Sequence, residues 1–237
     1  MLNTIATKML SKDFLLNVDM LECIRRGSSK ILFASDEAVL LIDIPSQIYM
    51  ISTQNAEISK TLVDRLPDNI NIIVAHEKFS YALLAKRFNF NETMICHNTV
   101  YTKKTPIQVQ NSIFEIKLLT QEHKDLIIRN YSKIDIVDTT YIENRLKAQV
   151  MFGAFLNNDL CGFIGSHEEG SIGMLEVLSN YRGKGIGAML QIVATNDALS
   201  NKRYPYGQVV ETNSASIALQ KKLGFELSKN KVYWLIK

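Results

Sequence analysis

Three glycines at alternate positions, 183, 185 and 187, are the feature that most constrains this chain. They follow a short apolar strand at positions 174–178 and open a stretch with a helical pattern. Glycine lacks a Cβ atom, so a ligand can approach the backbone closely, and the first amides of a helix have no partner inside it. The N-terminus of a helix also carries partial positive charge, to which Arg182 and Lys184 add two cations. The sequence therefore predicts a binding site for an anionic ligand such as a pyrophosphate.

Two common phosphate-binding motifs do not match this spacing. A P-loop requires Ser or Thr directly after its Gly-Lys pair, whereas Gly185 follows Lys184. A dinucleotide-binding fingerprint requires Gly-x-Gly-x-x-Gly and an acidic residue at the end of a second strand about 20 residues later. Neither element of that fingerprint is present, so both nucleotide-binding folds are excluded.

The stretch Arg-x-x-Gly-x-Gly, directly after the strand at 175–178, resembles the acyl-CoA pyrophosphate loop of the GNAT N-acetyltransferase superfamily. About 30 residues later, the stretch from Asn213 to Phe225 is similar to the Asn-x-x-Ser helix of that family, which ends in Leu-Gly-Phe. The resemblance implies acetyl-CoA as cosubstrate, with no metal. The residues it implies for CoA binding are Leu175, Glu176, Val177, Arg182, Gly183, Lys184, Gly185, Ile186, Gly187, Ala188, Asn213 and Ser216.

Two halves of the chain show the same order of predicted elements, which indicates an α+β protein made of tandem GNAT-like folds. In each fold we expect a mixed, mostly antiparallel sheet flanked by helices, and in the second a splayed pair of strands at the acyl-CoA site. The first half contains a helix at 13–25, strands at 30–35, 37–44 and 47–52, a helix at 55–66, a strand at 70–75, a helix at 77–88 and strands near Met94 and Val100. The second contains strands at 151–156, 160–167 and 171–178, helices at 185–199 and 213–223, and strands at 206–211 and 232–236.

The first half differs from the second where a CoA loop would stand. Positions 51–57 contain neither glycine nor a cation, so we expect a degenerate copy that binds no CoA and that covers a face of the second half or helps to form the acceptor pocket. Pro106, in a polar context, marks the boundary between a first domain at 1–105 and a catalytic domain at 106–237. In the second domain we also expect a strand at 113–118, a helix that begins after Thr120 and a helix at 140–149. The resemblance implies that these two helices form the walls of the acceptor site.

Transfer of an acyl group from a thioester to an amine requires a neutral amine, a hydrogen-bond donor for the oxyanion and a proton for the thiolate. The resemblance implies that a backbone N–H of positions 175–177 is the oxyanion donor. It places the base at Ser171 or Gln208, neither of which is basic. His167, Glu168 and Glu211 lie nearby, and we favour Glu169 and Glu176 as catalytic groups, acting directly or through water. Glu176 is the stronger candidate, because a carboxylate in an apolar strand is costly unless it has a partner or a function.

The proton donor departs from the family pattern. Many members have a tyrosine seven residues after the asparagine of the second motif, whereas this chain has Gln220, which cannot act as an acid. Either another tyrosine serves, or the thiolate leaves unassisted. The candidate tyrosines are Tyr181, Tyr204 and Tyr206.

Composition excludes several other classes of protein. The net charge is only +3 and the cations are scattered, which argues against a nucleic-acid partner. The three cysteines are far apart, so neither a disulfide framework nor a zinc site is indicated. No stretch reaches the ~20 apolar residues of a membrane span, and we expect a cytoplasmic protein.

We therefore expect an N-acetyltransferase that acts on a primary amine of a small molecule or amino acid. Its fused first half also resembles that of glycine N-acyltransferases, and a homodimer is compatible with the sequence. The alternative is a non-catalytic acyl-CoA sensor in which the missing tyrosine reflects lost catalysis.

Overall fold

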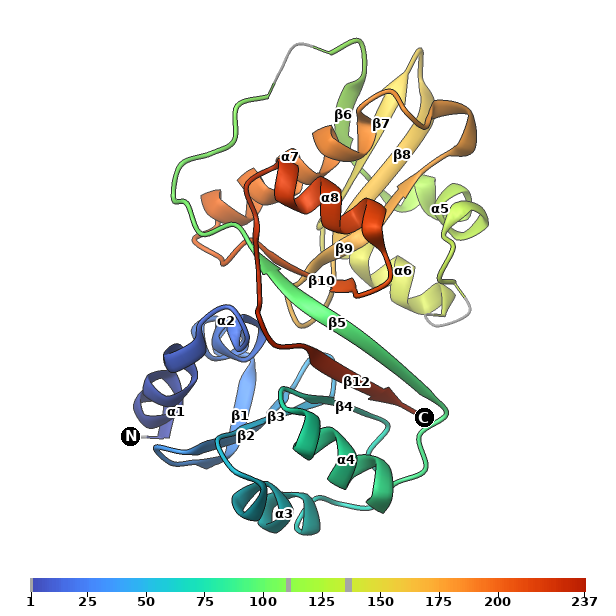
Figure 1. Ribbon diagram of the computed structural model, residues 1–237. Helices are drawn as coiled ribbons and strands as arrows, with labels where there is room; N and C mark the ends of the chain where they lie inside the picture. The colour runs from blue at the N-terminus through green and yellow to red at the C-terminus, as the bar shows by residue number, and fades with distance from the viewer. Residues whose placement is uncertain (1, 110–111, 135–137) are drawn as a thin grey trace. The chain divides into compact units, whose positions relative to one another are not determined.

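The computed structural model describes residues 2–109, 112–134 and 138–237, which form two compact units (Figure 1). The first unit consists of Met1–Val100, Tyr206–Lys221 and Phe225–Lys237. The second consists of Tyr101–Pro205 and Lys222–Gly224. The mixed α+β architecture expected from the sequence is confirmed.

The first unit is built on an eight-stranded sheet in the order β1-β2-β3-β4-β12-β5-β10, with β11 paired to β5. Only β3 and β4 are parallel among these pairs; the others are antiparallel. The strands are β1 (Ser29–Ala34), β2 (Ala38–Asp43), β3 (Ile48–Thr53), β4 (Ile72–Ala75), β5 (Glu92–Val100), β10 (Tyr206–Val210), β11 (Glu226–Leu227) and β12 (Val232–Ile236).

The last strand of the chain, β12, lies inside this sheet rather than at its edge. Tyr233 pairs with Ala75 of β4 on one side and with Ile95 of β5 on the other. The chain passes from the first unit to the second after Val100, near the boundary expected at 105/106, but its closing strands return to the first unit. The compact units therefore divide the chain differently from the halves 1–105 and 106–237. That these halves are copies of one fold stays a prediction.

Helices cover the sheet of the first unit. Side chains of α3 (Ala56–Asp64) and α4 (Lys78–Arg87), including Leu62 and Leu84, pack in one apolar cluster with Ile51 and Leu235 of the sheet. Helices α1 (Leu2–Leu10) and α2 (Val18–Arg26) contact β1. Asn55, the first residue of the helix predicted at 55–66, is of a type that favours the N-cap position, and it caps α3: its side chain accepts a hydrogen bond from the Ile58 N–H at 2.9 Å.

A buried polar pair joins α2 to the end of β4. His76 Nε2 lies 2.9 Å from Asp19 Oδ1, and both side chains are fully buried. His76 Nδ1 lies 2.9 Å from the Ile51 carbonyl, so both ring nitrogens have partners. This arrangement supports a structural role for His76, although its acidic partner is 57 positions away and could not be recognised by spacing.

The second unit contains a four-stranded antiparallel sheet in the order β6-β7-β8-β9, with helices on both faces (Figure 1). The strands are β6 (Glu115–Leu118), β7 (Met151–Leu156), β8 (Asp159–Ser166) and β9 (Ile172–Val177). Side chains of α5 (Lys124–Asn130) and α6 (Thr139–Lys147) form one apolar cluster with Phe163 and Met174. On the opposite face, α7 (Ile186–Ser200) packs on Ile164 and Ile172.

The predicted elements are found with shifts of a few residues at their ends, and α8 spans Ser214–Lys222. Two expectations were wrong or incomplete. The strands expected near Met94 and Val100 are one continuous strand, β5, because β12 pairs with its first part while β10 and β11 pair with its last part. Helix α1 was not predicted. Among the described residues, none of the helices combines the length and apolar character needed to cross a bilayer.

Candidate functional site

The turn from β9 into α7 has an open backbone. After a short 3-10 helix at Ser179–Tyr181, Gly183 and Gly185 adopt left-handed φ values of 77° and 81°. A Cβ atom at either position would meet no other atom within 4 Å, so backbone conformation rather than crowding requires glycine here. Both glycines are exposed, and a ligand can reach the backbone at this point.

The first amides of α7 point out of the helix beside this turn. Gly185 is the N-cap residue and supplies no side chain to them, and among the described residues no side chain caps the N-terminus of α7. These N–H groups and the partial positive charge of the helix end are therefore available to an anion.

Two exposed cations flank the open amides. Arg182 Nε donates a 3.0 Å hydrogen bond to the carbonyl of Val177, which ties the turn back to the end of β9. The ammonium group of Lys184 lies 5.3 Å from the centre of the Tyr181 ring. The predicted stretch 182–188 thus forms a concentrated positive site on one turn of backbone.

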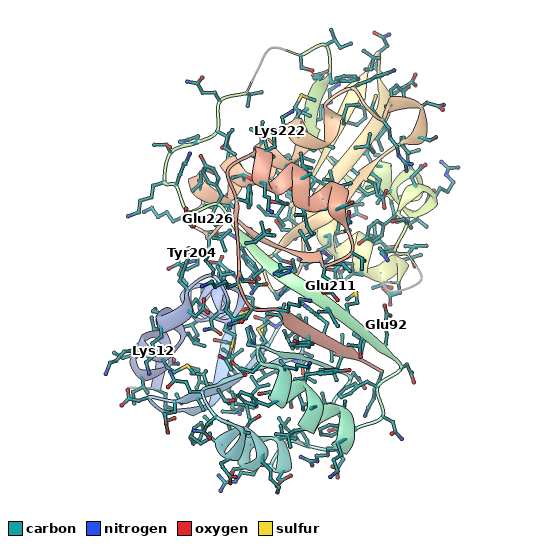
Figure 2. The ribbon with its side chains drawn as sticks, viewed as in Figure 1. Lys12, Glu92, Tyr204, Glu211, Lys222 and Glu226 are labelled. Carbon is teal, nitrogen blue, oxygen red and sulfur yellow. The ribbon has the colours of Figure 1, made fainter. Side chains whose placement is uncertain are left out.

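A cavity of about 440 Å³ lies beside this turn within the second unit. Its wall includes Lys184, Gly185 and Ala188, together with apolar side chains such as Ile107 and Phe114. Lys222, labelled in Figure 2, lines it as well. The cavity is therefore apolar in part and carries two ammonium groups.

Strand β9 is one of the two edge strands of its sheet, and its pairing with β8 contains a bulge. Met174 has a left-handed φ of 55°, and the register with β8 shifts between Phe163 and Gly165. The Leu178 N–H donates to the carbonyl of Cys161 on the neighbouring strand β8. The Val177 carbonyl instead accepts from Arg182, on the side of β9 away from β8. Since the N–H and C=O of one strand residue point to the same side, the Val177 N–H also lies on the free edge. Val177 thus directs its N–H to the free edge, and the role of any residue of 175–177 as oxyanion donor stays a prediction.

Glu176 points to the opposite face of the strand from Val177, toward the end of α5. Its carboxylate accepts hydrogen bonds from both the N–H and the hydroxyl group of Ser132, the former at 3.0 Å. Burial and the nearby Glu176 charge raise the pKa of Tyr131 to about 12. The sequence called for a partner or a function for Glu176, and the structure supplies partners in the hydroxyl group and the amide of Ser132.

The turn between β8 and β9 holds further ionisable groups. Glu169, only 4% exposed, accepts a hydrogen bond from the Ser171 hydroxyl. Arg145 of α6 pairs with Glu168 at 2.9 Å. The phenol oxygen of Tyr141, also on α6, lies 2.6 Å from Nδ1 of His167. The sequence places His167 next to this turn but gives no sign of its contact with Tyr141, which lies 26 positions away.

Comparison with known proteins agrees with the two motifs. Residues 152–235, which contain both, match the family model described as FR47-like protein. A GCN5-related N-acetyltransferase-like protein from Streptococcus suis is similar in structure, with a TM-score of 0.57 and 16% identity over 97% of this chain and 98% of that one. The chain therefore has the fold of proteins of the GNAT family.

Other structures show the same fold over most of the chain. A Drosophila protein aligns with a TM-score of 0.71 and 15% identity, covering 94% of this chain and 89% of its own. A GCN5-related N-acetyltransferase from Kribbella flavida aligns with a TM-score of 0.59 and 10% identity, covering 94% and 95%. No curated protein sequence matches. Identities this low establish the fold and leave the substrate open.

The second motif is divided between the two compact units: Lys222–Gly224 belong to the second, and the rest, including Asn213, belongs to the first. There, the Asn213 side chain accepts a hydrogen bond from the Ser216 N–H at 3.0 Å, as a helix cap does. Gln220 is buried, and so is Tyr206, one of the candidate proton donors. Tyr181, in the second unit, is half-buried against Lys184. The described residues contain no group of three or more His, Cys, Asp or Glu side chains arranged to hold a metal ion.

Proposed function

We propose that this chain is a GNAT-type, acyl-CoA-dependent N-acyltransferase, with acetyl-CoA as donor and a primary amine of a small molecule or amino acid as acceptor. The observation that carries the proposal is the uncapped N-terminus of α7. It follows two glycines with left-handed φ and is flanked by Arg182 and Lys184. An anion with several oxygens is the ligand that such a site stabilises most.

The pyrophosphate of CoA would accept hydrogen bonds from the amides of residues 183–188. The ionic contribution would come from Arg182 and Lys184, because both are exposed and can reach the phosphates. The partly apolar cavity with Lys184 and Lys222 suits the nucleotide end of CoA, which combines a flat base with a phosphate. The sequence also assigns Asn213 and Ser216 to CoA binding, and that assignment remains part of the proposal.

The acyl group would lie along the free edge of β9. There the Val177 N–H would donate to the oxyanion that forms when the amine attacks the thioester. Glu176 lies on the face of β9 toward the end of α5, and Glu169 lies in the turn before β9; these are the sequence candidates for the group that receives the amine proton. Both carboxylates lie in the second unit with Val177.

Release of free thiol from acetyl-CoA tests the proposal. The purified chain should release thiol in the presence of one or more of glycine, ethylamine and spermidine, which represent three classes of amine. Binding of acetyl-CoA without thiol release from any of them would favour the non-catalytic sensor. Absence of acetyl-CoA binding in calorimetry would reject the proposal altogether.

A further inference from the structure

Gly162 of β8 lies directly opposite Val177 of β9 in the antiparallel pairing of these strands. A Cβ atom built on Gly162 would lie 2.6 Å from the carbonyl oxygen of Glu176 and 3.2 Å from the Cα atom of Val177. Real Cβ atoms do not come within 3.0 Å of other atoms, so a side chain at 162 is incompatible with the present position of β9. The backbone at the end of β9 therefore occupies the space that a side chain on β8 would need.

The neighbour of Gly162 is backbone, which distinguishes this glycine from two others in the same sheet. At Gly153, the atoms nearest to a built Cβ belong to side chains, at distances between 2.7 and 2.9 Å. At Gly173, the nearest atom is Nε2 of the His167 ring, at 2.5 Å. A side chain can turn to another rotamer at some cost in packing, whereas a strand moves only together with its hydrogen bonds. Of these three glycines, only Gly162 would press an added methyl group against the backbone.

Two hydrogen bonds hold the end of β9 in this position. The Leu178 N–H donates to the carbonyl of Cys161 at 2.9 Å. On the other side of the strand, Arg182 Nε donates to the carbonyl of Val177 at 3.0 Å. A shift of the strand away from β8 lengthens the first of these bonds and changes the direction of the N–H groups beside it.

Position 162 also contacts the helix that follows the turn. Cγ2 of Ile186, the first residue of α7, would lie 3.3 Å from a Cβ atom on Gly162. This atom is a side-chain methyl group and can yield by a few tenths of an ångström, unlike the Glu176 carbonyl. Gly162 thus lies between the two parts of the proposed site, the free edge of β9 and the open amides of α7, all within the second unit.

We infer that Gly162 is a positioning residue for the proposed reaction. Because it has no side chain, the end of β9 lies close against β8, and this contact sets where the Val177 N–H stands relative to the amides of α7. The inference rests on the proposed acyltransferase function. In that function one acyl-CoA molecule spans both places, with its pyrophosphate at α7 and its thioester carbonyl at Val177, so their separation must match the molecule.

One added methyl group would displace the donor by an amount that matters for catalysis. To bring the contact with the Glu176 carbonyl from 2.6 Å to an ordinary 3.4 Å, the strand must move by the difference, about 0.8 Å. An oxyanion donor acts within a narrow range of about 2.7–3.1 Å, and a misplacement of about 1 Å can cost about 100-fold in rate. We therefore expect Gly162→Ala to lower kcat by about 10- to 100-fold.

The test compares kcat for thiol release at saturating acetyl-CoA with the calorimetric Kd for acetyl-CoA, using the amine probes named above. Gly162→Ala should show the loss in kcat while its Kd stays within about two-fold of wild type, because the Ile186 side chain can yield and the turn glycines need not move. A purely structural defect would instead reduce the number of binding sites and the rate in the same proportion. The split between kcat and Kd thus reports positioning.

Gly153→Ala is the matched control. It also inserts a methyl group into a closely packed part of the same sheet, but the atoms in its way belong to side chains and lie away from β9. It should lower the melting temperature, as Gly162→Ala does, and keep the wild-type kcat and Kd.

A second variant keeps the test decisive where Gly162→Ala folds poorly. Ile186→Leu removes the Cγ2 methyl group next to position 162 at equal side-chain volume, so it makes room on the side of α7 only. The double variant Gly162→Ala/Ile186→Leu should regain stability. Its kcat should still be about 10-fold or more below that of Ile186→Leu alone, because the contact with β9 remains.

Several outcomes would overturn the inference. Wild-type kcat in a folded Gly162→Ala chain would do so, as would an equal loss of kcat in Gly153→Ala. Recovery of kcat in the double variant would assign the effect to α7 instead of β9, and a double variant without a cooperative melting transition would assign Gly162 to folding. Each of these results leaves the acyltransferase proposal intact, whereas a wild-type chain that releases no thiol with any probe would reject that proposal itself.

Discussion

The turn from β9 into α7 and the turn from β3 into α3 each follow a run of three successive strands, but their backbone amides are satisfied in opposite ways. At α3, the Asn55 side chain accepts from the Ile58 N–H, and the Thr53 hydroxyl donates to the Asn55 carbonyl. At α7, Gly185 stands at the N-cap and offers no side chain. Amides that are capped internally are not available to a ligand, whereas uncapped amides beside two cations are.

The strands before the two turns differ in the same sense. Beyond β3 the sheet continues with β4, in parallel register from Tyr49 and Ile73 to Ile51 and Ala75. Strand β9 ends its sheet, and the Val177 N–H lies on the free edge. A strand needs a free edge to offer backbone donors to a ligand, so the second turn has the two features a CoA site requires and the first has neither.

The largest effect should come from closing the open turn. Gly185→Val places a β-branched residue at a φ of 81°, so the local backbone must rearrange and the amides must turn away from the ligand. We expect acetyl-CoA affinity to fall by about 100-fold or more, measured by isothermal titration calorimetry. The matched control is Gly27→Val, which imposes the same strain at a φ of 69° on the C-terminus of α2. That control should lower the melting temperature and leave affinity unchanged, and an equal loss of affinity in both variants would refute the local explanation.

A smaller effect should come from removing one cation of the turn. Lys184→Gln should weaken acetyl-CoA binding by about three- to ten-fold, because one exposed charge contributes on the order of 1 kcal/mol to an anion at a helix end. The difference from wild type should shrink as salt is added. Lys202→Gln, just beyond the other end of the same helix, is the control. Equal losses for both lysines would show that only overall charge matters.

In the first half, the corresponding change should affect stability instead of binding. Asn55→Ala removes the cap of α3 and should lower the free energy of unfolding by about 1 kcal/mol. Asn55→Asp retains the acceptor oxygen and should recover most of this loss. Denaturant titration and calorimetry together check both statements, and a drop in acetyl-CoA affinity in Asn55→Ala would contradict the contrast between the turns.

The smallest effect concerns Glu77, which lies at the N-terminus of α4 beside the turn from β3 into α3. Ser52 and Ser80 donate to its carboxylate at 2.9 Å and 3.0 Å, and burial raises its pKa above the ordinary value of 4.5. A carboxyl group whose folded pKa is raised stabilises the fold less as pH rises from the unfolded pKa through the folded one. The melting temperature of wild type relative to Glu77→Gln should therefore decline over that interval. A difference that does not change with pH would show that Glu77 has no raised pKa.

The contrast between the turns could be predicted from the sequence because it depends on local residues. Glycines at 183 and 185, beside Arg182 and Lys184, indicated an open anion site, and Asn55 indicated a capped helix. Each of these predictions depends on one residue type and the few backbone groups next to it, namely the positive φ that glycine allows and the cap that an asparagine side chain provides.

Pairings between distant residues could not be predicted in this way. The periodicity at 232–236 located a strand, but its position between β4 and β5 depends on residues more than 130 positions away. The contact between Tyr141 and His167 could not be predicted either, because Tyr141 lies on α6 and His167 follows β8. Gly173 was the one local signal, a glycine in an apolar strand, which often marks close approach of another group.

Calorimetric titration of the whole chain with acetyl-CoA tests the central claim most directly, since the claim is that only the turn before α7 binds CoA. The titration should saturate at one acetyl-CoA per chain, and Gly185→Val should leave no measurable site. A stoichiometry of two, or one site that survives Gly185→Val with unchanged affinity, would contradict the account.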